Sequence, residues 1–421
     1  MAKRVADDDA AACTETNNKR IRSESETSAA TAAGSDRRSV ALVHSGAYIR
    51  ACSRLPRMPE RAILIATLME AYGLHKHLQI VSPRLATADE LMMFHTREYI
   101  EFLEQGCPEQ DSDEESSDDE RNDRKIGETR AQRFGLELDC PPFAGIYEYA
   151  QAVAGATLTA AELLMDSNEA HTIAINWHGG WHHGRPDCAA GFCYVNDAVL
   201  GILALRRRFD RVLYVDIDLH HGDGVERAFE HSDRVACVSL HKHAPGFYPG
   251  TGVLSDTGRG RGKGYTVNFP VADGLTDSQL AHIVQALVEL AHERFQPNVI
   301  VLQCGVDTLV TDPYAAFNVT PVGVEQAVQS VLACKLPTLV LGGGGYHSPS
   351  VAKCFTSVTA HAILELEPLA RSIPEHDFFE QYSPDYGLRI SPSPSRPTLN
   401  TDAAIAAQLA TIRGAAFQTA Q

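Results

Sequence analysis

The sequence has 421 residues, of which 44% are hydrophobic and 22% charged, proportions that suit a globular protein with a sizeable core. Asp and Glu outnumber Lys and Arg by 54 to 37, which gives a formal net charge of -17. This balance disfavours a nucleic-acid backbone as the main ligand, because phosphate binding requires clustered Lys and Arg. It suits a basic substrate instead, since a negative surface raises the rate of encounter with cations.

Cysteine usage and hydropathy indicate the cellular compartment in which the protein is expected to lie. Ten cysteines occur, none of them in a C-x-x-C pair, and neither zinc-finger spacing nor a signal peptide is apparent. We therefore expect a reducing, intracellular environment. No apolar run approaches the ~20 residues that a membrane helix needs, so no membrane association is expected.

Two polar segments stand apart from the globular pattern. Residues 1–38 contain few large apolar side chains and are expected to form a disordered tail. Their basic clusters, at 3–4 and 19–22, fit a nuclear import signal and fit ordinary solvated charge equally well. Residues 108–125, "PEQDSDEESSDDERNDRK", carry like charges that repel one another, which predicts an acidic loop inserted at the surface.

The remaining chain alternates short apolar runs with amphipathic stretches. We expect one domain at residues 39–398, followed by a C-terminal segment at 399–421. Runs rich in β-branched residues predict buried strands at 171–176, 211–218, 234–240, 265–271, 298–303 and 337–343. Helical periodicity predicts helices at 60–72, 145–165, 195–207, 277–295 and 323–332. This alternation predicts an α/β fold, in which a parallel sheet is covered by helices on both faces.

Four of the predicted strands end in residues that can carry chemistry. In chain order, these strand ends deliver His182 and His183, then Asp216, Asp218 and His220, then Asp307, and finally Tyr346 after four glycines. Parallel sheets bind their ligands beyond the carboxyl ends of the strands, so we expect these side chains to lie in one site.

The D-x-D-x-H segment predicts a metal site. Residues two apart in an extended chain point to the same side, so Asp216, Asp218 and His220 would share one space. Two carboxylates and one imidazole can hold a divalent ion and leave a position open for water and substrate. We predict Asp218, His220 and Asp307 as the ligands, with zinc as the default ion and Fe(II) also compatible.

Hydrolysis at such a site also needs acid–base groups. His182 and His183 are the candidates, because imidazole exchanges protons near neutral pH. Asp216 and Asp223 could orient them, and Tyr346 could donate a hydrogen bond to an oxyanion.

Each motif also has a simpler interpretation. A histidine pair can be a core accident, D-x-D-x-H can hold a structural cation, and four glycines can form a flexible turn or a phosphate cradle. "GRGRGKG" is not a Walker loop, because Lys263 is followed by Gly264. The sequence contains neither H-E-x-x-H nor G-x-S-x-G, which removes the key residues of zincins and serine hydrolases.

The chain resembles class I of the zinc-dependent histone deacetylase family in five motifs, which follow the family's order and approximate spacing. These are "INWHGGWHHGRPDCAAGFCYVND", "YVDIDLHHGDGVE", "SLHKHAPGFYPGTG", "QCGVD" and "LGGGGY". The likeness spans about residues 40–397, and "LRRRFDRVLYVD" and "NVTPVG" are most similar to the histone deacetylase 8 branch. The resemblance implies an arginase-like α/β fold with a central eight-stranded parallel sheet. It implies a catalytic domain that hydrolyses acetyl-lysine in histone tails or other proteins, a role in chromatin and transcription regulation, and a location in the nucleus, with the cytoplasm as a second compartment.

The resemblance also implies a role for each residue that matches a motif. It gives the zinc ligands as Asp218, His220 and Asp307, the general base and acid as His183 with His182 as electrostatic partner, the paired aspartates as Asp216 and Asp223, and the oxyanion tyrosine as Tyr346. It gives Phe192 and Tyr248 as channel walls, the Gly191 carbonyl as acceptor for the lysine amide N–H, Asp139 as a rim residue and Arg61 as an arginine behind the site. It implies a first potassium site at Asp216, Asp218, His220, Ser239 and Leu240, and a second at Phe229, Ser232, Val235 and Tyr265. We expect Trp181 to wall the acetyl end of the channel and Trp177 to be core.

Several positions depart from the family pattern at the channel or its rim. Tyr248 stands where the family usually has Phe, Tyr314 where it usually has Leu or Met, and Leu138 where a Tyr is common. Substrate preference is therefore open. Cys140 and Cys193 could form a reversible disulfide if both flank the mouth, and two inert buried thiols are the alternative.

We thus expect a metal-dependent protein lysine deacetylase. Alternatives are hydrolysis of small acetylated amines or of longer acyl-lysines, and a scaffold that binds acetyl-lysine without hydrolysing it. Asp139 argues for a peptide, and the retained Tyr346 and metal ligands argue against a scaffold.

Overall fold

The computed structural model describes residues 39–107, 129–166 and 172–418, which all belong to one compact unit of residues 38–421. The predicted tail with its basic clusters, and the acidic run at 108–125, lie outside the described residues. Among the helices described, none is long and apolar enough to cross a membrane.

An eight-stranded parallel sheet organises this unit, in the order β2-β1-β3-β8-β7-β4-β5-β6. The strands are β1 (Val40–Val43), β2 (Gln79–Val81), β3 (Ile173–Asn176), β4 (Val212–Asp216), β5 (Val235–Lys242), β6 (Thr266–Val271), β7 (Val299–Gln303) and β8 (Thr338–Leu341). The predicted α/β class and parallel sheet are confirmed, and all six strands predicted from residue patterns are present.

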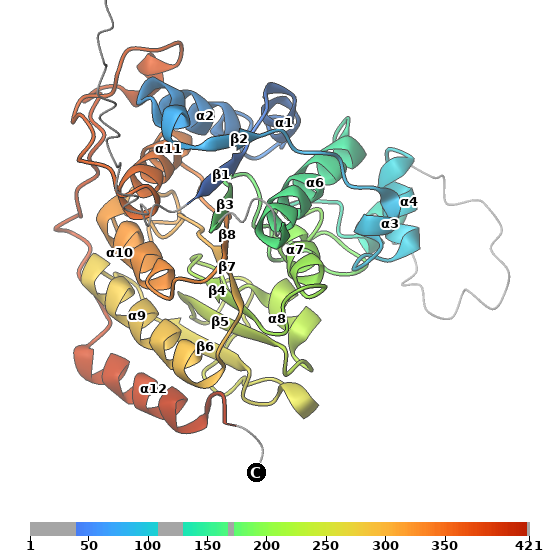
Figure 1. Ribbon diagram of the computed structural model, residues 1–421, viewed down its shortest axis with the longest axis vertical. Helices are drawn as coiled ribbons and strands as arrows, with labels where there is room; N and C mark the ends of the chain where they lie inside the picture. The colour runs from blue at the N-terminus through green and yellow to red at the C-terminus, as the bar shows by residue number, and fades with distance from the viewer. Residues whose placement is uncertain (1–38, 108–128, 167–171, 419–421) are drawn as a thin grey trace, which may run out of the picture. The chain divides into compact units, whose positions relative to one another are not determined.

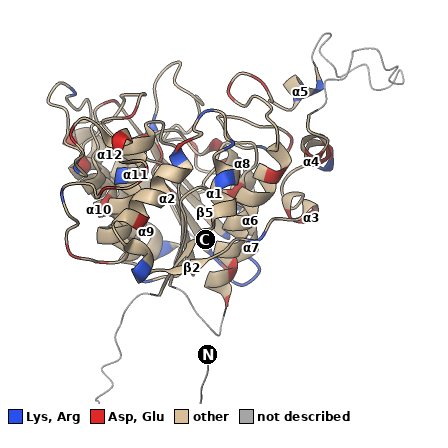
Figure 2. Cartoon of the chain, turned by 90° about the horizontal axis from the view of Figure 1, so that it is seen from above, with Lys and Arg blue, Asp and Glu red and all other residues tan. Residues whose placement is uncertain are grey.

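Helices cover both faces of the sheet (Figures 1 and 2). One layer contains α2 (Arg61–Ala71), α9 (Asp277–Arg294), α10 (Pro321–Leu332), α11 (Ser348–Ser357) and the π-helical turn η3 (Val358–Ile363). The other contains α1 (Gly46–Cys52), α4 (Arg97–Glu104), α6 (Ile146–Met165), α7 (Asp197–Leu205) and α8 (Asp223–Phe229). The short elements are α3 (Ala88–Leu91), α5 (Arg130–Arg133), η1 (Leu74–His77), η2 (Gly260–Gly262) and η4 (Phe379–Tyr382).

Successive residues of a strand enter opposite cores. In β4, Leu213 and Val215 pack into the core beneath α2, α9 and α10, whereas Val212 and Tyr214 pack into the core beneath α6 and α7. Strands buried on both faces read as continuous apolar runs, which is why the sequence predicted them.

The predicted C-terminal segment contains helix α12 (Asp402–Ala415), which packs on α9. Its Ile405 and Ile412 lie two turns apart and are both buried in the same core as α9. This part of the chain therefore contributes to the core.

The strand order identifies one edge position as the natural ligand site. The chain leaves β4 for β5 on one side, and leaves β7, the other neighbour of β4, for β8 on the opposite side. Ligands of open parallel sheets bind where the connections diverge in this way, beyond the carboxyl ends of the strands. The loops that follow β4 and β7 are therefore the first place to look for a site.

Candidate active site

The side chains singled out in the sequence follow four adjacent strands in the middle of the sheet. The order β3-β8-β7-β4 places the loops carrying His182 and His183, Tyr346, Asp307, and Asp218 with His220 side by side. Residues more than 100 positions apart thus meet at one edge, as the sequence predicted.

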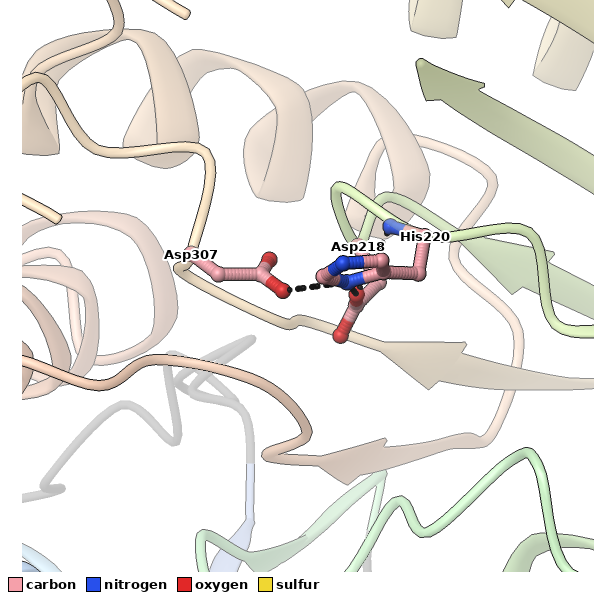
Figure 3. Close-up of side chains that lie close together, drawn as sticks. All are labelled: Asp218, His220 and Asp307. Atoms are coloured by element: carbon pink, nitrogen blue, oxygen red, sulfur yellow. Dashed lines mark hydrogen bonds and ion pairs between the residues drawn. The ribbon is translucent and has the colours of Figure 1, made fainter. Parts of the chain in front are cut away.

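Three of these residues form a cluster that could hold a metal ion (Figure 3). Asp218 and His220 lie in the loop after β4 and Asp307 in the loop after β7, and all three are buried. Their ligand atoms lie within 4.8 Å of one another. His220 Nδ1 lies 2.9 Å from Asp307 Oδ2 and 3.4 Å from Asp218 Oδ1.

Neighbouring groups hold the far oxygen of each carboxylate. The side-chain amide of Gln303 and the N–H of Gly344 both donate to Asp218 Oδ2 at 2.8 Å. The N–H of Leu219 donates to Asp307 Oδ1 at 2.9 Å. One oxygen of each aspartate is therefore fixed by the protein, and the other faces the cluster. The sequence did not single out Gln303, although a polar residue that ends the apolar strand β7 was a signal.

The charges of the cluster favour a bound cation. Burial and the charge of nearby Asp218 raise the pKa of Asp307 to about 7. Burial also opposes ionisation of Asp218, but His182 and His220 hold the pKa of that carboxyl well below its usual range. A divalent ion would offset the repulsion between the two carboxylates, so the donor set fits a metal.

Asp216 does not join this cluster, contrary to the extended geometry assumed for the D-x-D-x-H segment. Strand β4 ends at Asp216, and the chain turns immediately after it, so the alternation of an extended strand does not continue. Asp216 Oδ2 instead lies 2.7 Å from His182 Nδ1 and accepts a hydrogen bond from the Tyr214 hydroxyl.

Two histidine–aspartate pairs lie beside the cluster. His182 pairs with Asp216, and His183 Nδ1 lies 2.8 Å from the carboxylate of Asp223 at the start of α8. The Nε2 atoms of the two histidines are 3.1 Å apart. Arg185 also contacts Asp223 at 2.5 Å, a partner that the sequence did not indicate.

The two histidines differ in pKa. Burial and the charge of His182 lower the pKa of His183 to about 3. Burial also acts against the cationic form of His182, but Asp216 and Asp218 outweigh it and raise the pKa to about 9. Near neutral pH, these pKa values leave the His183 imidazole neutral and the His182 imidazole cationic, so His183 could accept a proton.

The start of α7 holds the turn that carries the histidine pair. The buried carboxylate of Asp197 accepts hydrogen bonds from the N–H groups of Gly180 and Trp181 and from the Thr157 hydroxyl. The side-chain amide of Asn196 donates to the carbonyls of His182 and Gly184. The first turn of α7 therefore fixes the backbone that presents both imidazoles.

Tyr346 lies in the loop after β8, and its ring centroid is 5.2 Å from that of Tyr314. Burial and the charges of Asp307 and Asp218 raise the pKa of Tyr346 well above its usual range, so the phenol stays protonated. The buried carboxylate of Asp312 accepts from the backbone N–H groups of Tyr346 and Tyr314 at 2.8 and 3.0 Å. Asp312, which the sequence did not single out, thus positions two tyrosines at the site.

Aromatic rings surround the approach to the cluster. The Tyr248 ring packs edge-on against His183 at a centroid distance of 5.0 Å, and the Tyr314 ring against His220 at 4.8 Å. The ring centroids of Phe192 and Tyr346 are 5.4 Å apart. Gly191 lies between His183 and Tyr248, and its carbonyl accepts a weak hydrogen bond from the Cys193 thiol at 3.4 Å.

The rim lies further out. Asp139 is exposed, and its neighbour Leu138 is 80% exposed. The Arg57 guanidinium donates to the Leu138 carbonyl and lies 5.7 Å from the Phe192 ring centroid. Cys140 and Cys193 are buried free thiols, and burial raises the pKa of Cys140 to about 12 and that of Cys193 well above its usual range. Their burial and raised pKa values favour the alternative of two inert thiols.

Arg61 and Trp181 line a small buried cavity together with Cys52, Tyr149 and His178. The Arg61 guanidinium donates to the carbonyls of Gly343 and Gly345 and lies 5.3 Å from the Trp181 ring centroid. Trp177 stacks on Phe355 at 4.2 Å in the core.

The residues predicted for potassium lie on β4, β5 and their flanks. Asp216 and Ser239 are aligned partners on β4 and β5, and Leu240 follows in β5. Phe229 is the last residue of α8, and Ser232 lies in the turn between α8 and β5, which begins at Val235. The carbonyl of Tyr265, the residue before β6, accepts from the N–H of Cys237.

Comparison with known proteins gives a consistent result. The family model described as "Histone deacetylase domain" matches residues 55–362. Over 373 residues the chain is 46% identical to histone deacetylase 8 of Xenopus tropicalis, with 88% of this chain and 96% of that protein covered. Identity to histone deacetylase 8 of Danio rerio is 45% over 377 residues, which cover 90% of this chain and 95% of that protein. Identity to histone deacetylase 1 of Homo sapiens is 42% over 338 residues, which cover 80% of this chain and 66% of that protein. The resemblance stated from the motifs, and the arginase-like fold that it implies, are confirmed.

Proposed function

The chain belongs to the histone deacetylase family, and from this premise we propose that it hydrolyses N6-acetyl-lysine in histones and other proteins to lysine and acetate. One observation carries the proposal. A buried Asp–His–Asp cluster lies beside two histidine–aspartate pairs and a protonated tyrosine, at adjoining strand ends. A scaffold that only binds acetyl-lysine has no need of acid–base pairs, so the arrangement favours an enzyme.

We propose zinc as the ion of this cluster, with Fe(II) as the alternative, because both accept mixed nitrogen and oxygen ligands. Asp218, His220 and Asp307 would hold it. When bound, such an ion supplies a Lewis acid that polarises the acyl carbonyl and lowers the pKa of a water molecule. Potassium is proposed at the two residue sets described above.

His183 is proposed to act first as general base and then as general acid. Its Nδ1 faces Asp223, and the lowered pKa leaves the imidazole neutral, so Nε2 would take a proton from the attacking water. The same nitrogen would then deliver the proton to the leaving lysine nitrogen. The cationic His182 would stabilise the negative charge that develops in the transition state.

Tyr346 is proposed to donate its hydroxyl hydrogen to the oxyanion formed from the acetyl oxygen. Phe192 and Tyr248 would wall the lysine side chain, with Trp181 and Tyr314 as further lining residues and Asp139 holding the peptide backbone. Histone tails are basic, which suits a chain of net charge -17. We propose that the chain acts on them in the nucleus.

The test is turnover of an acetyl-lysine peptide by the purified full chain, with added zinc and with a chelator. We expect acetate release that the chelator abolishes and zinc restores. His183→Ala and Tyr346→Phe should each lower kcat by about 100-fold or more, because each removes a group that acts in the transition state.

His77→Ala and Tyr386→Phe are matched controls, since both residues lie away from the site, and they should leave kcat unchanged. Loss of turnover in the controls would point to a folding defect. If the metal-loaded chain hydrolyses no acetyl-lysine peptide, but cleaves a small acetylated amine or a longer acyl-lysine, the corresponding alternative substrate class replaces the proposal.

A further inference from the structure

Arg185 contacts the aspartate of one histidine–aspartate pair on the side away from the histidine. His183 Nδ1 lies 2.8 Å from Oδ1 of Asp223, and the Arg185 guanidinium donates to the other oxygen, Oδ2, at 2.5 Å. The Asp223 side chain is 2% exposed, whereas the Arg185 side chain is 27% exposed. The arginine therefore connects a buried carboxylate of the site to the surface.

The second histidine–aspartate pair is held by a different kind of donor. Asp216 Oδ2 lies 2.7 Å from His182 Nδ1 and also accepts from the Tyr214 hydroxyl at 2.7 Å. Its Oδ1 accepts from the Asp218 N–H at 3.1 Å. The tyrosine hydroxyl and the backbone N–H are both neutral. The pair proposed to transfer protons is thus the one whose aspartate has a cation on its far oxygen.

The backbone on both sides of the contact is anchored. The Arg185 N–H donates to the Cys188 carbonyl at 3.0 Å, and the carbonyl of Gly184 accepts from the Asn196 side-chain amide at 2.9 Å. Asp223 is the first residue of α8. An ion pair with a buried carboxylate is also screened less by water than a pair between two exposed side chains.

The buried carboxylate needs a charged partner. Burial opposes ionisation of Asp223, but the contact with His183 and the charge of Arg185 bring the pKa of this carboxyl below its usual value. Without the guanidinium, Oδ2 would lose a charged donor in a site with little access to water. A carboxylate in that position gains by turning toward another donor or by taking up a proton, and either change would disturb its contact with the imidazole.

We propose that Arg185 is a positioning residue for the reaction. Its guanidinium holds the Asp223 carboxylate in place, and Asp223 in turn keeps the imidazole proton of His183 on Nδ1. The Nε2 atom is then free to accept a proton from the attacking water, because the hydrogen bond at one ring nitrogen determines the state of the other. Arg185 acts through Asp223, and this inference rests on the proposed deacetylase function.

The kinetics of Arg185→Met test this role, because methionine keeps an apolar stem and removes the charge and every donor. We expect kcat for an acetyl-lysine peptide to fall by about 10-fold, in line with the loss of a charged hydrogen bond to a buried group. KM and zinc affinity should each change by less than about twofold. Arg185→Gln should resemble Arg185→Met, whereas Arg185→Lys keeps the charge and should retain kcat within about threefold.

A double-mutant cycle shows whether Arg185 acts through Asp223. Asp223→Asn should lower kcat by itself. In that background, Arg185→Met should change kcat by less than about twofold, because the partner through which the arginine acts is already lost. A purely structural role of Arg185 would lower kcat by the same factor in both backgrounds.

Nitrogen-15 NMR of the chain labelled at histidine gives a readout that does not depend on turnover. The signals of His183 are identified by their absence in His183→Ala. We expect the Nδ1–H tautomer of His183 in the unmodified chain and loss of this single form in Arg185→Met.

Arg234→Met is the matched control. The Arg234 guanidinium pairs with Asp210 at 3.3 Å, and both side chains are exposed. The two residues lie before β5 and β4, at the edge of the sheet opposite to the site. This variant should leave kcat, KM and the His183 tautomer unchanged.

Three results would overturn the inference and leave the deacetylase function intact: an unchanged kcat in both Arg185→Met and Arg185→Gln, a rise in KM in place of the fall in kcat, or an equal effect of Arg185→Met with and without Asp223→Asn. If the unmodified chain with metal bound hydrolyses no acetyl-lysine peptide, the proposed function itself fails, and this inference fails with it.

Discussion

At the residue scale, the proposed metal ligand Asp218 depends on neighbouring groups outside the ligand cluster. Asp218 keeps one oxygen toward the cluster because Gln303 and the Gly344 N–H hold the other. Gln303 in turn is held by its own contacts, since its amide also donates to the Gly180 carbonyl and its oxygen accepts from the Gly305 N–H. A side chain at Gly305 would collide with the Asp218 carboxylate, so the close packing around this carboxylate requires glycine at position 305.

Replacing Gln303 by Leu should therefore weaken metal binding. The substitution removes a donor from a buried ligand oxygen, and loss of such a partner costs about 10- to 100-fold in metal affinity. Competition with a chelator of known affinity measures it directly. Gln285→Leu is the control, because Gln285 is an exposed residue of α9 whose side-chain amide donates to Glu289, and the metal affinity of this variant should be unchanged. Equal affinities for the two variants would show that Gln303 does not orient the ligand.

The sequence predicted the residues that carry chemistry better than those that support them. Asp218, His220 and Asp307 lie in long motifs at strand ends, so topology alone was enough to bring them together. Gln303 bonds Asp218 across 85 residues, and Asp312 acts through backbone N–H groups. Such partnerships depend on three-dimensional packing and leave no periodic pattern in the chain.

At the element scale, strands were predicted where burial made them uniformly apolar. Strand β2 was not predicted from residue patterns, because it contains only three residues and is mostly exposed. Strand β1 was also missed, although its four residues are apolar and buried and it is as long as the predicted strands β3 and β8. Helix α10 was predicted to begin at 323 and begins at Pro321. The Thr320 hydroxyl accepts from the Val322 N–H there, and a proline suits the first turn of a helix.

The start of α7 is the element boundary on which the active site most depends. Asp197→Asn should destabilise the fold by about 1–3 kcal/mol, because a buried carboxylate that accepts from Gly180, Trp181 and Thr157 is replaced by an amide with only one acceptor oxygen. Urea unfolding of the zinc-loaded chain measures the change in the free energy of unfolding.

Asp377→Asn provides the control, because Asp377 is exposed, and it should change the free energy of unfolding by less than about 0.5 kcal/mol. Since the Asp197 contacts hold the turn that presents His182 and His183, kcat should also fall in Asp197→Asn. Unaltered stability and kcat would mean that the turn is held by its other contacts, such as those of Asn196.

At the scale of the whole molecule, charge is unevenly distributed along the chain. Lys, Arg, Asp and Glu are interspersed over the helices drawn in Figure 2, whereas residues 108–125 contain nine acidic and three basic residues. This run precedes Leu138 and Asp139 of the rim by a short stretch of sequence. A concentration of negative charge attracts basic ligands over a range set by ionic strength.

The acidic run should therefore bias the enzyme toward acetyl-lysines in basic surroundings. Deleting residues 108–125 is expected to reduce, by about 3- to 10-fold, the ratio of kcat/KM values for a basic and a neutral acetyl-lysine peptide at low salt. Raising the salt concentration should lower the ratio of the full chain toward that of the deletion variant, because mobile ions screen exposed charges. A Gly/Ser segment of equal length separates charge from loop length, and it should behave as the deletion does. A selectivity that survives both changes would assign the preference to the rim itself, where Asp139 is the exposed carboxylate.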